Sequence, residues 1–174
     1  MATLTVWRYD TPLGADAAEV RLKAVQEKGA ITVHDAVTVA WMPGAHQPRI
    51  GHLRHATAGA AGKGSVLGAL VGMLVLAPAA GAAAGAGIAA IAQRLRGTGI
   101  DQGFLEDVSS HLVPGTSALL VLSDEADLEV VRPMIQRGLS RGDVVLLHAE
   151  LDDDAPAVIR DLLREPGPPS SNED

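Results

Sequence analysis

The stretch GSVLGALVGMLVLAPAAGAAAGAGIAAIAQ, residues 64–93, decides how the rest of the chain is interpreted, because it carries no charged side chain. Glycine recurs at every fourth position on both sides of Pro78, which places hydrogen side chains along one helix face and lets a second helix approach closely. We therefore predict an inserted Gly/Ala-rich helical hairpin at residues 59–97. The glycines predicted to serve helix packing and oligomerisation are Gly64, Gly68, Gly72, Gly81 and Gly85.

The length and flanks of this hairpin favour contact with a membrane. Pro78 divides it into halves at Ala60–Ala77 and Ala79–Leu95, each about 26 Å long as a helix and so slightly short of a hydrocarbon core of about 30 Å. No acidic residue lies between Asp35 and Asp101. Basic residues flank the hairpin on both sides, which favours leaving both ends on the cytoplasmic side of a membrane. The predicted membrane-flanking residues are Arg49, Arg54, Lys63, Arg94 and Arg96.

A different environment satisfies the same pattern. Glycine costs about 1 kcal/mol relative to alanine in a helix interior, so this number of glycines requires packing contacts that offset the cost. Those contacts are made either between helices embedded in lipid or with the same hairpin in other copies of the chain. The alternative prediction is therefore a soluble homo-oligomer with the hairpin at its subunit interfaces.

The segments on either side of the hairpin alternate between strand and helix patterns. Period-two alternation and apolar runs predict strands at 3–9, 31–41, 48–53, 117–122 and 143–149. Asp16 is placed to cap a helix that ends at Gly29, and a second helix follows Asp101 and stops at Pro114-Gly115. Further helices are expected from Asp124 and at 155–163.

Two strand-helix-strand units, 3–41 and 117–149, remain when the middle of the chain is set aside. They predict a ferredoxin-like βαβ-βαβ α+β domain, with the first strands of the two units at the centre of the sheet. This domain is discontinuous and comprises residues 1–58 and 98–165, separated by the hairpin at 59–97. A disordered, proline-rich tail is expected at 166–174.

Composition excludes several classes of function. The chain has no cysteine, so thiolate metal sites and cysteine nucleophiles are ruled out. Two Trp, one Tyr and one Phe leave few stacking platforms, and no nucleic-acid partner is predicted. The N-terminal residues form a strand pattern without the basic and apolar regions of a signal peptide, so we expect the α+β domain to be cytoplasmic.

No motif in the sequence defines a catalytic, cofactor or metal site. Gly59–Ser65 lacks the spacing of a phosphate loop, and Asp152–Asp154 lacks the glycine and distal glutamate of a calcium loop. His34 and Asp35 are neighbours on a strand, so their side chains point to opposite faces and form a poor dyad. Three histidines, His46, His52 and His55, have no carboxylate nearby in sequence to complete a metal site. We predict no enzyme activity.

The chain resembles a bacterial family of unknown function, the domain of unknown function numbered twelve sixty-nine, whose members are described as membrane proteins. The resemblance rests on the glycine-rich run 68–90, on Gly99–Asp101 followed by Phe104–Glu106, and above all on LVPGTSAL at 112–119. It covers nearly the whole chain to Ala149. It implies the architecture and a membrane location, and it supplies no catalytic residues.

These observations together predict a non-enzymatic, membrane-associated protein that self-assembles through its hairpin. Its expected partners are other copies of itself and an anionic membrane surface. The alternative is a soluble cytoplasmic homo-oligomeric scaffold.

Overall fold

The computed structural model describes residues 2–53, 66–79, 84–124 and 144–152. Its strands are β1 (Thr3–Tyr9), β2 (Thr32–Ala40), β3 (Arg49–His52), β4 (Ser117–Asp124) and β5 (Val144–Glu150). Its helices are α1 (Gly14–Glu27), α2 (Val66–Ala79), α3 (Ala84–Arg94) and α4 (Gln102–His111). The helices predicted from Asp124 and at 155–163, and the tail at 166–174, lie outside the described residues.

The strands form one sheet in the order β3-β2-β4-β1-β5, and every neighbouring pair is antiparallel. β4 lies between the two strands of the first predicted unit, and β1 lies between the two strands of the second. This interleaving is the order expected of a ferredoxin-like sheet, and β1 and β4 take the predicted central positions. The α+β fold class is confirmed, with β3 added at one edge as the predicted partner of β2.

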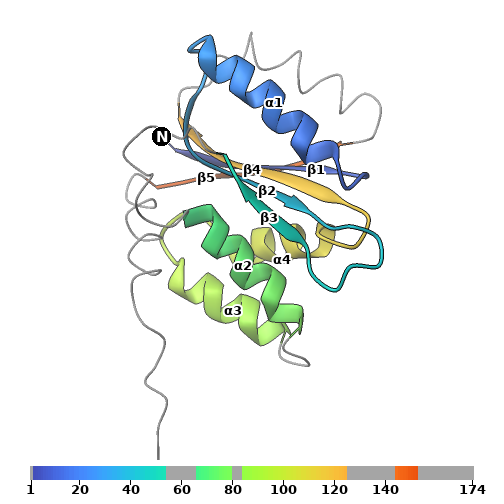
Figure 1. The fold of residues 1–174 in the computed structure, drawn as a ribbon. Coiled ribbons are helices and arrows are strands. Elements are labelled where there is room, and N and C mark those ends of the chain that lie inside the picture. The colour runs from blue at the N-terminus through green and yellow to red at the C-terminus, as the bar shows by residue number, and fades with distance from the viewer. Residues whose placement is uncertain (1, 54–65, 80–83, 125–143, 153–174) are drawn as a thin grey trace, which may run out of the picture.

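Helices cover both faces of the sheet (Figure 1). α1 packs on one face against β1, β2 and β4. On the other face, α2 lies under β2, β3 and β4, α4 lies near β5, and α3 packs on α2 and α4. The hairpin and the helix that follows it therefore form a layer on the chain's own sheet.

Four bulky side chains of α2 point into this core. Leu67, Leu70, Val71 and Leu74 follow helical i, i+3, i+4, i+7 spacing, and each is at most 2% exposed. They belong to one cluster with the sheet residues Leu4, Val6, Val37, Val39, Ala118, Leu120 and Leu122. Four of the apolar residues that made the first half of the hairpin suited to lipid are thus buried against the sheet, whereas Met73 is 38% exposed.

Two local expectations about helix ends differ from the structure. α1 begins at Gly14, so Asp16 lies inside its first turn, and the residue at the N-cap, Leu13, forms no side-chain cap. An amide of this first turn is instead reached by Ser117 from β4, as described below. α2 continues through Pro78 to Ala79, so the proline lies in the last turn of the helix rather than between the two helices.

Within the described ranges, none of the helices has both the length and the apolar character needed to cross a membrane.

The single tyrosine is buried beneath the start of α1. Burial raises the pKa of Tyr9 from 10.0 to about 12, with Arg21 opposing part of the rise. Because the folded-state pKa lies above the unfolded one, the stability gained by burying the neutral phenol is complete below pH 10 and is lost as the pH rises toward about 12. We expect the free energy of unfolding to fall by about 2 kcal/mol from this group over that window.

Absorbance of the phenolate reports this titration directly, because the chain holds one Tyr. Urea unfolding across the same pH window should show a smaller decline in the Tyr9→Phe variant than in the native chain. Equal declines in the two proteins would contradict the assignment.

Candidate functional site

The outward face of α2 is the strongest candidate for a functional surface. Gly72 lies on this face, opposite the buried leucines, and a Cβ built at Gly72 meets no atom within 4 Å. The next residue, Met73, is 38% exposed. The contact between α2 and α3 therefore leaves the position of Gly72 uncovered.

The other glycines of the predicted packing faces are distributed as follows. Gly68 lies one turn before Gly72 on α2 and is half-buried, and Gly85 lies in α3. Gly64 and Gly81 lie outside the described residues. The structure thus brings Gly68 and Gly72 onto one helix face at the predicted spacing.

A carboxylate from the sheet holds the beginning of this helix. The backbone N–H of Leu67, the second residue of α2, donates to Oδ2 of Asp35 at 3.0 Å. Asp35 follows an irregularity in the pairing of β2 with β4, between Val33 and Asp35. A negative charge at a helix N-terminus is favourable, because the first amides lack partners within the helix. Asp35, the last acidic residue before the acid-free region, therefore anchors the hairpin to the sheet.

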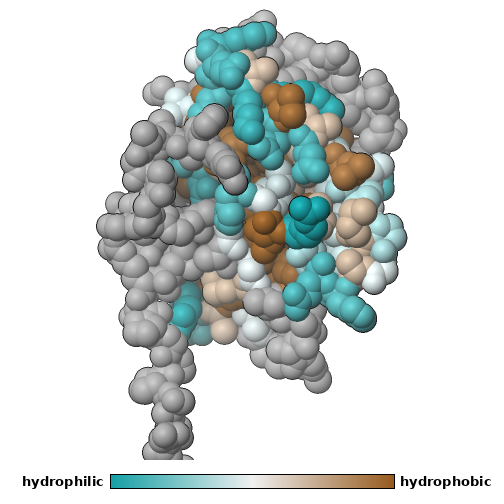
Figure 2. Space-filling view, viewed as in Figure 1, coloured by the Kyte–Doolittle hydropathy of each residue, from teal (hydrophilic) through white to brown (hydrophobic). Residues whose placement is uncertain are grey.

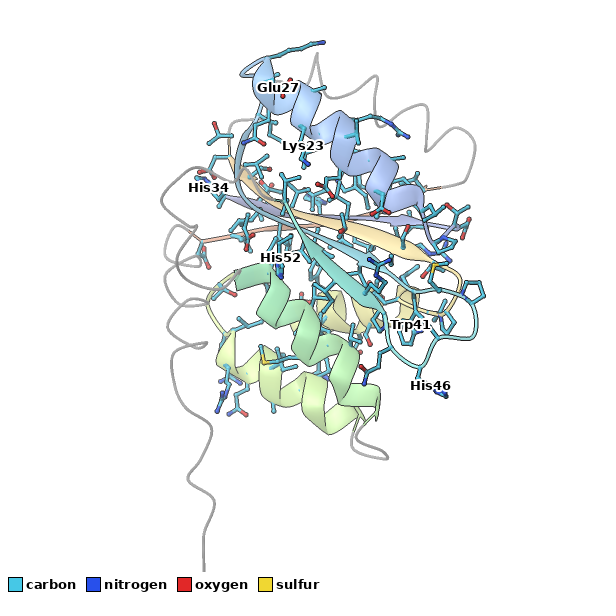
Figure 3. The ribbon with its side chains drawn as sticks, viewed as in Figure 1. Lys23, Glu27, His34, Trp41, His46 and His52 are labelled. Carbon is cyan, nitrogen blue, oxygen red and sulfur yellow. The ribbon has the colours of Figure 1, made fainter. Side chains whose placement is uncertain are left out.

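His34, the residue at this irregularity, has a different partner. Its Nε2 lies 2.5 Å from Oδ2 of Asp124 at the end of β4, and Figure 3 shows His34 at that end of the sheet. The two neighbours His34 and Asp35 thus act separately, as expected for adjacent residues on a strand.

Replacing Asp35 by alanine should loosen α2 without unfolding the sheet. We expect the free energy of unfolding to fall by about 1 kcal/mol, because a helix amide loses its side-chain acceptor. Amide hydrogen exchange should accelerate at the start of α2. Asp35→Asn, which retains an acceptor oxygen, should lose less, and equal losses in both variants would argue against a hydrogen-bonding role.

The segment LVPGTSAL forms the joint between α4, β4 and the end of β2. The N–H of Gly115 donates to the Trp41 carbonyl at 2.8 Å, and the Trp41 N–H donates to the Thr116 carbonyl at 2.9 Å. Gly115 has a φ of 93°, which favours glycine. The Thr116 hydroxyl donates to the Val113 carbonyl at 2.7 Å and accepts from the Val113 N–H at 3.2 Å.

Ser117 completes this joint by reaching the helix on the other face of the sheet. Its side-chain hydroxyl accepts from the N–H of Ala15, the second residue of α1, at 2.9 Å and donates to the Thr11 carbonyl at 2.6 Å. Ser117 is fully buried. α1 and α2 are therefore both held at their second amide by a side chain from the sheet, and sequence reasoning missed both contacts. The only indication in the sequence for the role of Ser117 was a hydroxyl side chain at the first position of a largely apolar strand.

The predicted membrane-flanking arginines that the structure describes do not gather on one surface. Arg49 begins β3 and pairs with Ala40, at the end of the sheet where β4 begins. Arg94 and Arg96 close α3 at the opposite end, where the Thr98 carbonyl accepts from the N–H of Asp152, just after β5. All three arginines are exposed. Arg54 and Lys63 lie outside the described residues.

The histidines are also dispersed. His46 lies at the tip of the turn after β2 and His52 lies at the end of β3, and Figure 3 shows them apart. His55, Asp153 and Asp154 lie outside the described residues. In the part of the chain that the structure describes, no group of three or more His, Asp or Glu side chains is arranged to hold a metal ion.

The fold and its candidate surface define a class: an α+β domain whose ferredoxin-like sheet is covered on one face by an inserted layer of helices. The chain belongs to the family described as a protein of unknown function (DUF1269), which matches residues 61–164. The match includes residues 61–97 of the hairpin and LVPGTSAL. It begins after the first strand-helix-strand unit and extends beyond Ala149, so it covers a different range from the one the resemblance indicated. No curated protein and no solved structure matches the chain.

Proposed function

We propose that this chain is a non-enzymatic, self-assembling protein, in which the glycine face of α2 packs against another copy. The observation that carries the proposal is the open position at Gly72, on the helix whose opposite face is fully buried. A helix that buries Leu67, Leu70 and Leu74 in its own core and leaves open space at Gly72 has separate surfaces for folding and for assembly.

The energetics of glycine support this assignment. Each glycine in a helix interior costs about 1 kcal/mol relative to alanine, and at Gly72 no described side chain of the same chain fills the space. Close approach of another helix would offset that cost through dispersion contacts along the backbone. Met73, which is 38% exposed beside it, would add apolar area to the contact.

Light scattering of Gly72→Leu against Gly72→Ala tests the proposal. Neither side chain meets an atom of the chain at its Cβ, so both variants should fold, and Ala should raise the midpoint of thermal unfolding slightly because of its better helix propensity. We expect the native chain and Gly72→Ala to assemble and Gly72→Leu to run as a smaller species. An unchanged mass for Gly72→Leu would reject the α2 face as the contact.

A second candidate function is association with an anionic membrane surface, with the α+β domain on the cytoplasmic side. It is favoured by Arg94 and Arg96, which are exposed together at the end of α3 and form no ion pair within the described residues. Each basic residue near such a surface contributes about 1 kcal/mol. Because Leu67, Leu70 and Leu74 of α2 are buried in the core, this contact would be made by the surface of the folded domain.

Flotation with lipid vesicles separates the two candidates. Binding to phosphatidylglycerol vesicles but not to phosphatidylcholine vesicles, with a loss in the Arg94→Glu, Arg96→Glu double variant, would support the membrane surface as partner. A chain that stays with the aqueous fraction in both cases, and that assembles without detergent, would leave the soluble homo-oligomer as the function.

A further inference from the structure

α1 carries an apolar stripe on its outward face that the fold does not use. Leu13 is 63% exposed and Val20 is 68% exposed, the two highest exposures among the large apolar side chains of the described residues. Ala17 and Ala24 are also exposed and continue the stripe. Figure 2 shows brown and tan side chains running between teal ones along this helix. The spacing of 13, 17, 20 and 24 is the four-three-four repeat of a helix that packs on another helix.

This stripe is separate from the inward face of the same helix. Ala15, Ala18, Leu22 and Val25 point toward the sheet and are buried. α1 therefore has two apolar faces, although one is enough to hold it in the domain. The outward face is the one that needs a partner to be removed from water.

Charge is divided unevenly along α1. The first half carries Asp16 and Glu19. The second half carries Arg21 and Lys23 with a single acid, Glu27, and Lys28 follows directly after the helix. Lys23 reaches back to Glu19 at 2.7 Å, and Figure 3 shows Lys23 and Glu27 along the second half of the helix. An antiparallel second copy of α1 would place acidic and basic halves side by side.

We infer that α1 is a self-complementary contact, which pairs antiparallel with α1 of a second copy about a two-fold axis. With the axis at the middle of the stripe, Leu13 faces Ala24 of the other copy and Ala17 faces Val20, so each large side chain meets a small one. On one flank, Asp16 lies beside Lys23 of the other copy, and symmetry makes this contact twice.

A parallel pair fits less well. In parallel helices each flanking residue faces the one five positions further along. This would bring Asp16 beside Arg21, an attractive pair, but it would also bring Lys23 beside Lys28, whereas the antiparallel pair has no such repulsive contact. It would also align the two helix dipoles in the same direction, whereas an antiparallel pair opposes them. The occupant that fits the stripe is therefore a second copy in the antiparallel orientation.

This contact does not depend on the proposed function. α1 and α2 cover opposite faces of the sheet, so substitutions on one helix leave the other surface in place.

Cysteine cross-linking tests both the contact and its orientation, because the chain has no native cysteine. Ala17→Cys and Val20→Cys chains, distinguished by a mass tag, are mixed and oxidised. The antiparallel pair predicts that the mixed dimer, which joins position 17 of one chain to position 20 of the other, exceeds both homodimers. It should also exceed the background of an exposed control, Ser110→Cys on α4. A mixed dimer at the control level, or a predominance of homodimers, would overturn the inference.

Charge substitution gives an independent measurement by sedimentation. We expect Val20→Lys to weaken self-association on the order of a hundredfold, since it places a charge in the apolar contact without disturbing a buried site. Asp16→Lys should weaken it several-fold, and Asp16→Lys with Lys23→Asp should restore it. Failure of the double variant to restore association would contradict the antiparallel pairing.

Comparing the assembled mass of Gly72→Leu with the yield of the cross-link distinguishes failure of the α1 contact from failure of the α2 contact. If Gly72→Leu lowers the assembled mass while the mixed cross-link between positions 17 and 20 stays at background, the α1 contact fails and the α2 contact stands. If Gly72→Leu changes nothing while the cross-link forms, the α2 contact fails and the α1 contact stands.

Discussion

Gly99→Ala should cost about 4 kcal/mol of unfolding free energy or more, enough to leave much of the chain unfolded. A Cβ at this position would overlap the carbonyl oxygen of Glu150 and lie 3.1 Å from the Cα of Leu151, and both obstacles are backbone. The φ of Gly99 is +87°, so an alanine there is strained even without the overlap. Circular dichroism during urea unfolding measures the effect.

Gly97→Ala is the matched control. Gly97 has a similar φ of +85°, but a Cβ there meets no atom within 4 Å. We expect this variant to lose only the cost of the left-handed conformation, about 1 kcal/mol. Equal losses at 97 and 99 would show that the close approach to β5 does not set the requirement for glycine.

The second large effect is expected at Ser117. Ser117→Ala removes one hydroxyl that serves the N–H of Ala15 and the carbonyl of Thr11. The N–H of Ala15 is left without this partner in a buried site, whereas the carbonyl of the exposed Thr11 still accepts from the N–H of Gly14 at 3.3 Å. A buried group that loses its partner costs about 1–3 kcal/mol, so we expect a loss of about 2 kcal/mol. Amide exchange should accelerate mainly in the first turn of α1.

Ser110→Ala provides the comparison, since Ser110 is exposed on α4 and its hydroxyl donates to the Asp107 carbonyl of its own helix. We expect it to change the unfolding free energy by less than about 0.5 kcal/mol. Similar losses for the two serines would contradict a special role for the hydroxyl between β4 and α1.

Local patterns predicted the sheet well. The period-two alternation of Thr3–Tyr9 and the apolar run at Ser117–Leu122 led to the two central strands. The apolar run is what β4 requires, because a strand covered by helices on both faces needs apolar side chains throughout. Pro43-Gly44 marked the turn that returns β3 onto β2. These features depend on residues close together in sequence.

The position of the hairpin could not be predicted in the same way. The leucines of α2 are apolar enough to face lipid, other copies or the chain's own sheet, and only the tertiary structure shows that they pack on residues such as Val37 and Leu120. The hydrogen bonds from the sheet to the beginnings of α1 and α2 could not be predicted for a similar reason. Asp35 is 32 residues from Leu67 and Ser117 is 102 residues from Ala15, so no sequence motif links the donor to the acceptor.

The layer formed by α2, α3 and α4 covers the sheet as a separate subunit could, but it belongs to the same chain. A ferredoxin-like sheet with helices on one face alone would present Leu4, Val6, Val39 and Leu120 to water, and it would need another protein to cover them. Here the covering helices belong to the same chain, most of them to the insertion, so they are present at a high effective concentration. An isolated sheet domain prepared without residues 59–97 would therefore be expected to precipitate, and adding back the missing segment as a separate peptide would be a form of subunit reconstitution.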